Sequence, residues 1–164
     1  VETLGEGNDR IQIRPMGDGF VFHNKDKESE EEFRRKTELA KEAWQMVEKE
    51  VMSDAWDLIV LDEINYAIHF GMISAGEVAE LIQKRPERLN MILTGRYAEQ
   101  QLIDLADTVT EMTLVKHAFQ KGIRARKGIE FQGNADNDLS SAPFNKKQYL
   151  MGMGCCFLND FKVY

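Results

Sequence analysis

Two adjacent carboxylates, Asp62 and Glu63, directly follow the short apolar run Leu58–Leu61. An apolar run of this length is typical of a buried strand in a parallel α/β sheet, where polar residues at the carboxyl end form ligand sites. Two carboxylates at such an end can hold Mg²⁺ or orient a nucleophile. The alternative is a charged strand end that caps a neighbouring helix, and the spacing alone favours neither interpretation.

A second apolar run, Met91–Leu93, ends in Thr94, Gly95 and Arg96. These residues place a hydroxyl, a flexible position and a fixed cation at the end of the next expected strand. The planar fork of arginine suits phosphate or carboxylate groups, because it donates two parallel hydrogen bonds. Three residues are a weak motif, and taken alone they favour an ordinary strand end.

Near the start of the chain, Phe20 and Phe22 follow the glycine-containing stretch Gly17–Gly19. Alternate residues of an extended segment share a face, so both rings could lie against a flat hydrophobic ligand. Taken alone, the pattern favours a half-buried edge strand.

Composition excludes several classes of function. The net charge of −7 argues against general nucleic-acid binding, and no apolar stretch approaches the roughly 20 residues that span a bilayer. The three histidines lie far apart without metal-ligand spacing, which favours structural or solvent-facing roles. The only cysteines, Cys155 and Cys156, are adjacent and form neither a disulfide framework nor a zinc site, which indicates a reducing cytoplasm.

Helices and strands alternate through the middle of the chain. Ser29 with Glu32, and Ser74 with Glu77, are capping-box pairs that predict two helix starts, and Pro86 ends the second helix. The expected strands cover residues 57–62, 89–94 and 108–115, with a short helix over 98–106. This order predicts a parallel α/β sheet with right-handed crossovers.

Beyond residue 131 the composition changes. Residues 133–145 are rich in Asn, Asp, Ser and Gly and predict a linker or disordered segment, whereas 149–164 are apolar and could form a strand or short helix. We therefore divide the chain into a domain over 1–131 and an extension over 132–164 of unknown fold.

Several linked motifs occur in a fixed order over residues 1–131. They are Gly17-Asp18-Gly19-Phe20, Asp57-Leu58-Ile59-Val60-Leu61-Asp62-Glu63-Ile64-Asn65-Tyr66-Ala67, Arg85-Pro86, Leu93-Thr94-Gly95-Arg96, Ala106-Asp107-Thr108-Val109-Thr110-Glu111-Met112, Val115-Lys116-His117 and Gly128-Ile129-Glu130-Phe131. This set resembles the ATP:corrinoid adenosyltransferases of cobalamin biosynthesis and salvage.

The resemblance implies a three-layer parallel sheet of the P-loop NTPase (RecA-like) type, usually a cytoplasmic homodimer, with a flavin-dependent reductase as a possible partner. It implies that cobalt(I) of a corrinoid attacks the 5′ carbon of MgATP and expels triphosphate. Glu63, with Asp62 beside it, would hold Mg²⁺, whereas Phe20 and Phe22 would line the corrinoid face. The remaining family positions, Asn65, Thr94 and Arg96, would contact the nucleotide or shape its site.

The chain departs from the family pattern in two respects, of which the second is that residues 132–164 extend beyond the usual family terminus. The first concerns the phosphate loop. The chain has no glycine-rich phosphate loop GxxxxGK[ST], which the family carries with a central strand on a segment before the first of these motifs. We expect that segment to be missing by truncation or rearrangement, with residues 156–158 or 161–164 as candidates for a replacement strand. A non-enzymatic corrinoid- or nucleotide-binding relative, or a dimerising fragment, are the alternatives.

Overall fold

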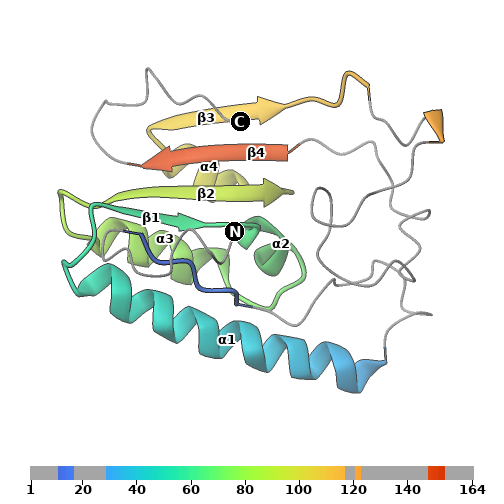
Figure 1. The fold of residues 1–164 in the computed structure, drawn as a ribbon, viewed down its shortest axis with the longest axis horizontal. Helices are drawn as coiled ribbons and strands as arrows, with labels where there is room; N and C mark the ends of the chain where they lie inside the picture. The colour runs from blue at the N-terminus through green and yellow to red at the C-terminus, as the bar shows by residue number, and fades with distance from the viewer. Residues whose placement is uncertain (1–10, 17–28, 117–120, 123–147, 154–164) are drawn as a thin grey trace.

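The computed structural model describes residues 11–16, 29–116, 121–122 and 148–153 (Figure 1). Its elements, in chain order, are α1 (Glu30–Met52), β1 (Leu58–Leu61), α2 (Ile64–His69), α3 (Ala75–Lys84), β2 (Asn90–Arg96), α4 (Gln100–Leu105), β3 (Thr108–Met112) and β4 (Gln148–Met153). None of the described helices combines the length and apolarity that crossing a bilayer requires.

Both predicted capping boxes form. At the start of α1 the Ser29 hydroxyl accepts from the Glu32 N–H at 3.2 Å, and the Glu32 carboxylate accepts from the Ser29 N–H at 3.0 Å. These bonds satisfy two of the backbone donors that a helix start leaves free. Ser74 and Glu77 repeat the arrangement at α3, which ends at Lys84, two residues before Pro86. The sequence signals for both helices are therefore confirmed.

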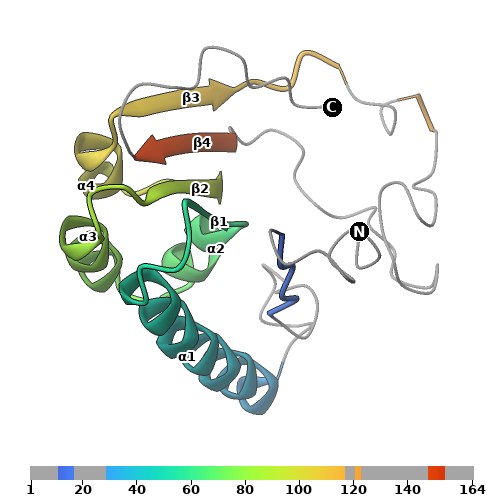
Figure 2. The same cartoon turned by 60° about the vertical axis from the view of Figure 1, so that its left-hand side comes forward.

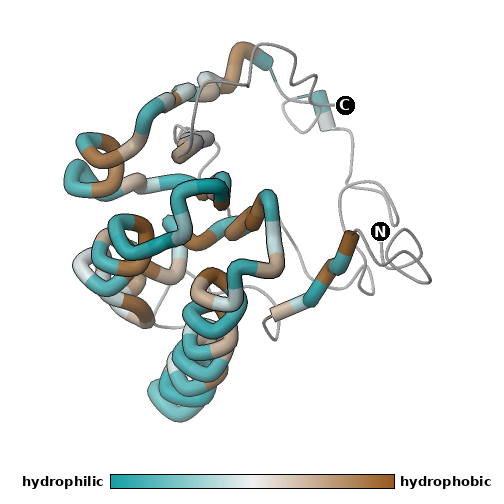
Figure 3. The backbone as a smooth tube through the Cα atoms, turned by 90° about the vertical axis from the view of Figure 1, so that its left-hand side faces the viewer, coloured by the Kyte–Doolittle hydropathy of each residue, from teal (hydrophilic) through white to brown (hydrophobic). Residues whose placement is uncertain are grey.

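Helix α1 buries little of its surface. Its buried side chains are Trp44 and Val51, and hydrophilic residues cover most of its length (Figure 3). These two side chains join a single core with α3, α4 and the sheet. The core therefore lies on the side of the sheet that carries α3 and α4.

The four strands form one sheet in the order β1-β2-β4-β3. Strand β1 pairs with β2 in parallel, as predicted, with Leu61 opposite Leu93. Strand β4 lies between β2 and β3 and is antiparallel to both (Figure 1). The sheet is therefore mixed: the predicted parallel arrangement is confirmed for β1 and β2, whereas β4, which the prediction did not include, is antiparallel.

The replacement strand predicted at the C-terminal end forms earlier than expected. Residues 156–158 and 161–164, the predicted candidates, lie outside the described residues, whereas β4 covers Gln148–Met153. Its side chains Met151 and Met153 are 0% and 2% exposed and join the same core as Met91 and Leu93. A segment from the predicted extension thus supplies a central strand of the sheet.

Within the described part of the chain, the helices gather on one side of the sheet (Figure 2). Leu58 and Val60 point to the other face, because alternate residues of a strand face opposite ways, and they are 42% and 52% exposed. The described residues thus form two layers. The third layer that the resemblance implies is not among them and stays a prediction.

We predict that Met151→Ala lowers the free energy of unfolding by about 2–4 kcal/mol, because it leaves a cavity beneath a central strand. Met112→Ala is the matched control: Met112 lies on β3 and is 49% exposed, so we expect a loss below about 1 kcal/mol. Urea denaturation of the full chain measures both. Equal losses in the two variants would contradict a central, buried β4.

Candidate functional site

The two predicted polar groups meet at the carboxyl end of the parallel pair. Strand β1 ends at Leu61 opposite Leu93 of β2, which continues to Arg96, so Asp62 and Thr94 come next at neighbouring positions. Residues that are about thirty positions apart in the chain are thereby brought to one edge of the sheet. Four of the predicted site residues lie here, and a fifth, Asn65, lies directly beneath them.

The Thr94 hydroxyl joins the two strand ends. It accepts a hydrogen bond from the Glu63 backbone N–H at 2.9 Å and donates one to Asp62 Oδ1 at 2.6 Å. A bond to an ionised carboxylate is stronger than one between neutral groups, so this short contact fixes the Asp62 side chain. Thr94 is therefore a site-shaping residue.

Glu63 occupies an unusual backbone conformation. Its φ is +57°, in the left-handed region that non-glycine residues seldom adopt. It stands at the N-cap of α2, but its side chain makes no capping hydrogen bond to that helix. The alternative that these carboxylates merely cap a helix is therefore not supported at Glu63.

Gly95 allows the two loops to pack closely. Its φ is +122°, and a Cβ at this position would lie 3.0 Å from Asn65 Cβ and 3.3 Å from Glu63 Cα. Only glycine meets both conditions without a shift of the neighbouring backbone. The flexible middle residue of the Thr94–Arg96 motif is therefore a packing requirement.

Asn65 is fully buried beneath this edge. Its Nδ2 donates to the Gly95 carbonyl at 3.4 Å, whereas its Oδ1 has no hydrogen-bond partner among the described residues. A buried oxygen without a partner costs free energy, typically about 1–3 kcal/mol. Such a cost is tolerated most often at functional sites.

Aromatic side chains border the site next to Arg96. The ring of Tyr97 stacks on His69, with centroids 4.0 Å apart and planes 12° apart, and Tyr66 meets Tyr97 edge-on at 5.7 Å. Tyr97 has a left-handed φ of +62°. None of these three residues was predicted to belong to the site; the aromatic spacing in α2 was the available signal, and the stacking on Tyr97 could not be read from it.

The charges of the site oppose one another. Burial raises the pKa of Glu63, the neighbouring Asp62 carboxylate raises it further, and Arg96 counteracts both. Burial also raises the pKa of the Tyr66 phenol, again against the influence of Arg96. Arg96 is therefore the cation that offsets this partly desolvated acidic edge.

The donor set fits a magnesium ion that shares its ligands with a substrate. Mg²⁺ is usually bound through one or two carboxylates together with waters and phosphate oxygens. Asp62 and Glu63 supply two carboxylates, and the described residues contain no cluster of three or more acidic, His or Cys side chains suited to a metal. The site could thus hold Mg²⁺ only with further oxygens from a bound ligand or water.

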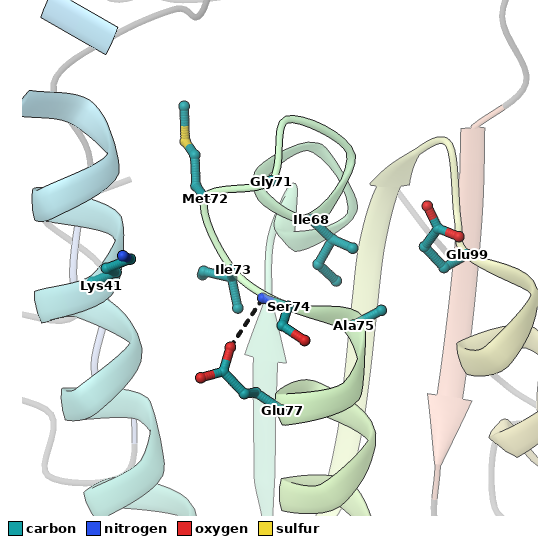
Figure 4. Close-up of a pocket in the computed structure, with 9 residues that line it drawn as sticks. All are labelled: Lys41, Ile68, Gly71, Met72, Ile73, Ser74, Ala75, Glu77 and Glu99. Atoms are coloured by element: carbon teal, nitrogen blue, oxygen red, sulfur yellow. Dashed lines mark hydrogen bonds between the residues drawn. The ribbon is translucent and has the colours of Figure 1, made fainter. Parts of the chain in front are cut away.

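Two predicted residues and a cavity of the molecule do not belong to this edge. Phe20 and Phe22 are outside the described residues, so the structure does not place them relative to this edge. A cavity of about 480 Å³ opens between α1, the α2–α3 connection and the start of α4 (Figure 4). It is lined by Lys41, Met72 and Glu99 among others, and by none of the predicted site residues.

The motifs on both sides of this edge match one family. The family model described as ATP:corrinoid adenosyltransferase BtuR/CobO/CobP matches residues 1–131. The chain belongs to the ATP:corrinoid adenosyltransferase family.

Curated members of this family are similar over the same region. A corrinoid adenosyltransferase of Pseudomonas aeruginosa is 38% identical over 123 residues, which are 75% of this chain and 58% of the relative. One from Sinorhizobium is 35% identical over 75% of this chain and 55% of its own, and one from Escherichia coli K12 is 31% identical over 74% and 59%. The chain thus spans little more than half the length of these relatives.

The family match covers the whole carboxyl edge but not the whole sheet. Asp62, Glu63, Asn65, Thr94 and Arg96 all lie within residues 1–131, whereas β4 lies beyond them. The candidate adenosyltransferase site and the strand that completes its sheet therefore come from different parts of the chain.

We predict that Gly95→Ala destabilises the chain by more than about 2 kcal/mol, because the new methyl group meets Glu63 and Asn65 in a backbone conformation that disfavours alanine. Gly71→Ala is the matched control. Gly71 also has a positive φ, of +71°, but nothing lies within 4 Å of its added Cβ, so only backbone strain of about 1 kcal/mol remains. In thermal unfolding, the Tm of Gly95→Ala should lie well below that of Gly71→Ala. A lower Tm for Gly71→Ala would refute the close approach of Gly95 to its neighbours.

We predict that Glu63→Gln changes the pH dependence of stability. Folding raises the pKa of Glu63 above its ordinary 4.5, so the folded state binds more protons than the unfolded chain in the window above that value. The contribution of Glu63 to stability is therefore lost as the pH rises through this window. Glu63→Gln should gain stability relative to the parent between about pH 4 and pH 7, measured by urea denaturation at each pH.

The control for this pH series is Glu87→Gln, which removes an exposed carboxylate from the α3–β2 connection. The free energy of unfolding of Glu87→Gln should follow that of the parent across the same pH range. A Glu63→Gln curve that runs parallel to the parent would show that the carboxylate is not desolvated on folding.

Proposed function

We propose that the carboxyl edge of β1 and β2 is the magnesium and nucleotide side of an adenosyltransferase site, acting on ATP and a corrinoid. The observation that supports this is the constellation of Asp62, Glu63 and Thr94, tied by one hydroxyl beside Arg96, within the residues that the family model matches. Membership of this family also supports a sheet of the P-loop NTPase (RecA-like) type.

Each residue of the site would have its own task. Asp62 and Glu63 would hold Mg²⁺, which when bound neutralises charge on the triphosphate. Arg96 would donate to phosphate oxygens, since its guanidinium already offsets the charge of this acidic edge. Thr94 and Asn65 would keep the strand ends in place, and Phe20 and Phe22 would lie against the corrinoid.

The reaction is a nucleophilic displacement at carbon. The cobalt(I) of the corrinoid substrate supplies an electron pair to C5′ of ATP and forms a cobalt–carbon bond. The C5′–oxygen bond breaks, and triphosphate leaves with the electron pair of that bond. The site accelerates this step by offsetting the charge that gathers on the leaving group, which is the task that Arg96 and the carboxylate-bound cation would share.

The partners and the location belong to the same proposal. We infer a cytoplasmic enzyme that acts as a homodimer, with a flavin-dependent reductase as the partner that supplies electrons for reduction of the cobalt. These inferences rest on the family alone.

A second candidate function is a binding protein without catalysis. The 164 residues contain no GxxxxGK[ST] loop, and backbone N–H groups of such a loop are what cradle a triphosphate. A chain of this composition could hold a corrinoid, or a nucleotide weakly, without transferring the adenosyl group. A dimerising fragment that binds neither ligand is the third candidate.

We predict that the 164-residue chain binds MgATP with a Kd above about 1 mM, because it has no GxxxxGK[ST] loop whose backbone N–H groups would cradle the triphosphate. Isothermal titration with MgATP, and separately absorbance titration with cob(II)alamin, separate the candidates. Corrinoid binding without MgATP binding favours the binding protein, and binding of neither favours the dimerising fragment. A micromolar MgATP affinity in this chain would overturn the prediction.

The enzyme itself is tested in a chain extended at its N-terminus by a relative's GxxxxGK[ST] segment. There Glu63→Gln should weaken MgATP binding and adenosyl transfer at least about tenfold, whereas Glu87→Gln should change neither. In the 164-residue chain Glu63→Gln should have no effect on ligand binding. Full activity of Glu63→Gln in the extended chain would rule out its proposed role.

A further inference from the structure

The turn after β2 departs from the usual backbone of a strand end. Gly95 and Tyr97, the residues on either side of Arg96, have φ values of +122° and +62°. Glycine adopts such a backbone readily, whereas a residue as bulky as tyrosine seldom does and is strained there. A strained residue persists only where the surrounding structure holds it. The conformation of Tyr97 therefore calls for contacts beyond the turn itself.

Rings from α2 supply such contacts. His69 and Phe70 follow Tyr66 by three and four positions, so their rings share one face of the helix and its C-terminal end. The Tyr97 ring stacks on His69 with centroids 4.0 Å apart and meets Tyr66 edge-on at 5.7 Å. Phe70 lies against both of these partners, 6.0 Å from Tyr66 and 5.3 Å from His69. Stacked and edge-on pairs attract one another beyond the effect of buried area, so Tyr97 belongs to a cluster of four rings.

The same cluster reaches the guanidinium of Arg96. Burial raises the pKa of the Tyr66 phenol, whereas the charge of Arg96 and a side-chain hydrogen bond with it lower that pKa. Burial and the Asp62 carboxylate raise the pKa of Glu63, and Arg96 again lowers it. Arg96 is thus close to both the Tyr66 phenol and the Glu63 carboxylate. Since Tyr66 contacts both Tyr97 and Arg96, the rings and the cation form one connected group.

We propose that Tyr97 and His69 are positioning residues, whose stacked rings fix the turn after β2 and thereby hold the guanidinium of Arg96 at the acidic edge. A side chain as long as arginine loses rotamer freedom when it binds a ligand, and one that is held beforehand loses less. Arg96 is therefore ready to donate to an anionic oxygen. That this oxygen belongs to a phosphate rests on the proposed function, whereas the positioning is a property of the chain without a ligand.

The order of the Arg96 side chain tests the positioning. We would measure the order parameter of its Nε–H bond by nitrogen relaxation in the 164-residue chain, with Arg96→Lys to identify the signal. His69 is the residue to change, because it is exposed and its replacement leaves the core intact. His69→Ala removes the stacked ring, whereas His69→Phe keeps a flat ring. Gln83→Ala, at an exposed position on α3, is the control.

The order parameter should be near the rigid value of about 0.85 in the parent, in His69→Phe and in Gln83→Ala, and below about 0.6 in His69→Ala. The backbone amides of Thr94 and Gly95 should stay ordered throughout, because the Thr94 hydroxyl still joins the strand ends.

Equal order of Arg96 in His69→Ala and the parent would overturn the proposal, as would loss of order in His69→Phe. Loss of order at Thr94 and Gly95 together with Arg96 would also overturn it, since His69 would then support the whole strand end.

MgATP added to the same samples separates this inference from the proposed function. We expect the Arg96 Nε–H signal of the parent to shift at millimolar MgATP. His69→Ala should need at least about threefold more MgATP for the same shift, because the apparent affinity falls with the fraction of molecules in which Arg96 is in place. A parent signal that does not shift, with Arg96 disordered only in His69→Ala, would support the positioning and count against Arg96 as a phosphate ligand.

Discussion

The hydroxyl of Thr94 is the contact on which the carboxyl edge of the sheet depends. It accepts from the backbone of Glu63 and donates to the side chain of Asp62, so a single oxygen sets both the turn after β1 and the direction of its first carboxylate. Backbone pairing of β1 with β2 brings the strand ends together but does not orient the residues beyond them.

The position of β4 brings a second part of the chain to the same edge. Because β4 is antiparallel, its first residue, Gln148, lies opposite Arg96 at the carboxyl end of β2. A parallel strand at this position would instead have its last residue at this edge of the sheet. The direction of the central strand therefore brings its first residue, Gln148, to this edge, and Gln148 lies beyond the region that the family model matches.

Local signals made much of this fold predictable. Capping boxes at Ser29 and Ser74 and the stop at Pro86 depend on neighbouring residues only, and the apolar runs before Asp62 and Thr94 mark strands. The second of these strands is buried, whereas the first exposes Leu58 and Val60. The site residues of β1 and β2 could be grouped on this basis, because parallel strands end at the same edge. Helix α2 was not predicted, since six residues carry too little periodicity to stand out from a loop.

Other features depend on contacts between distant residues, which one sequence does not reveal. The apolar character of residues 149–164 predicted a strand or a short helix, but neither the central place of β4 nor its direction has a local signal. Tyr97, which has a left-handed backbone, stacks its ring on His69, a pairing between residues of distant segments. The roles of Phe20 and Phe22 stay predictions, as they lie outside the described residues.

The unfavourable features of this edge argue that it is kept for a purpose other than stability. Glu63 combines a left-handed backbone with a carboxylate whose pKa is raised by burial and by Asp62, and Asn65 beneath it has a buried oxygen without a partner among the described residues. Each feature costs free energy in the isolated chain. A bound cation would lower the cost of the paired carboxylates, since it restores a favourable environment for the ionised form. A charged strand end with only a capping role would carry none of these costs, which is why the concentration of strain, burial and like charge at one place supports a ligand site there.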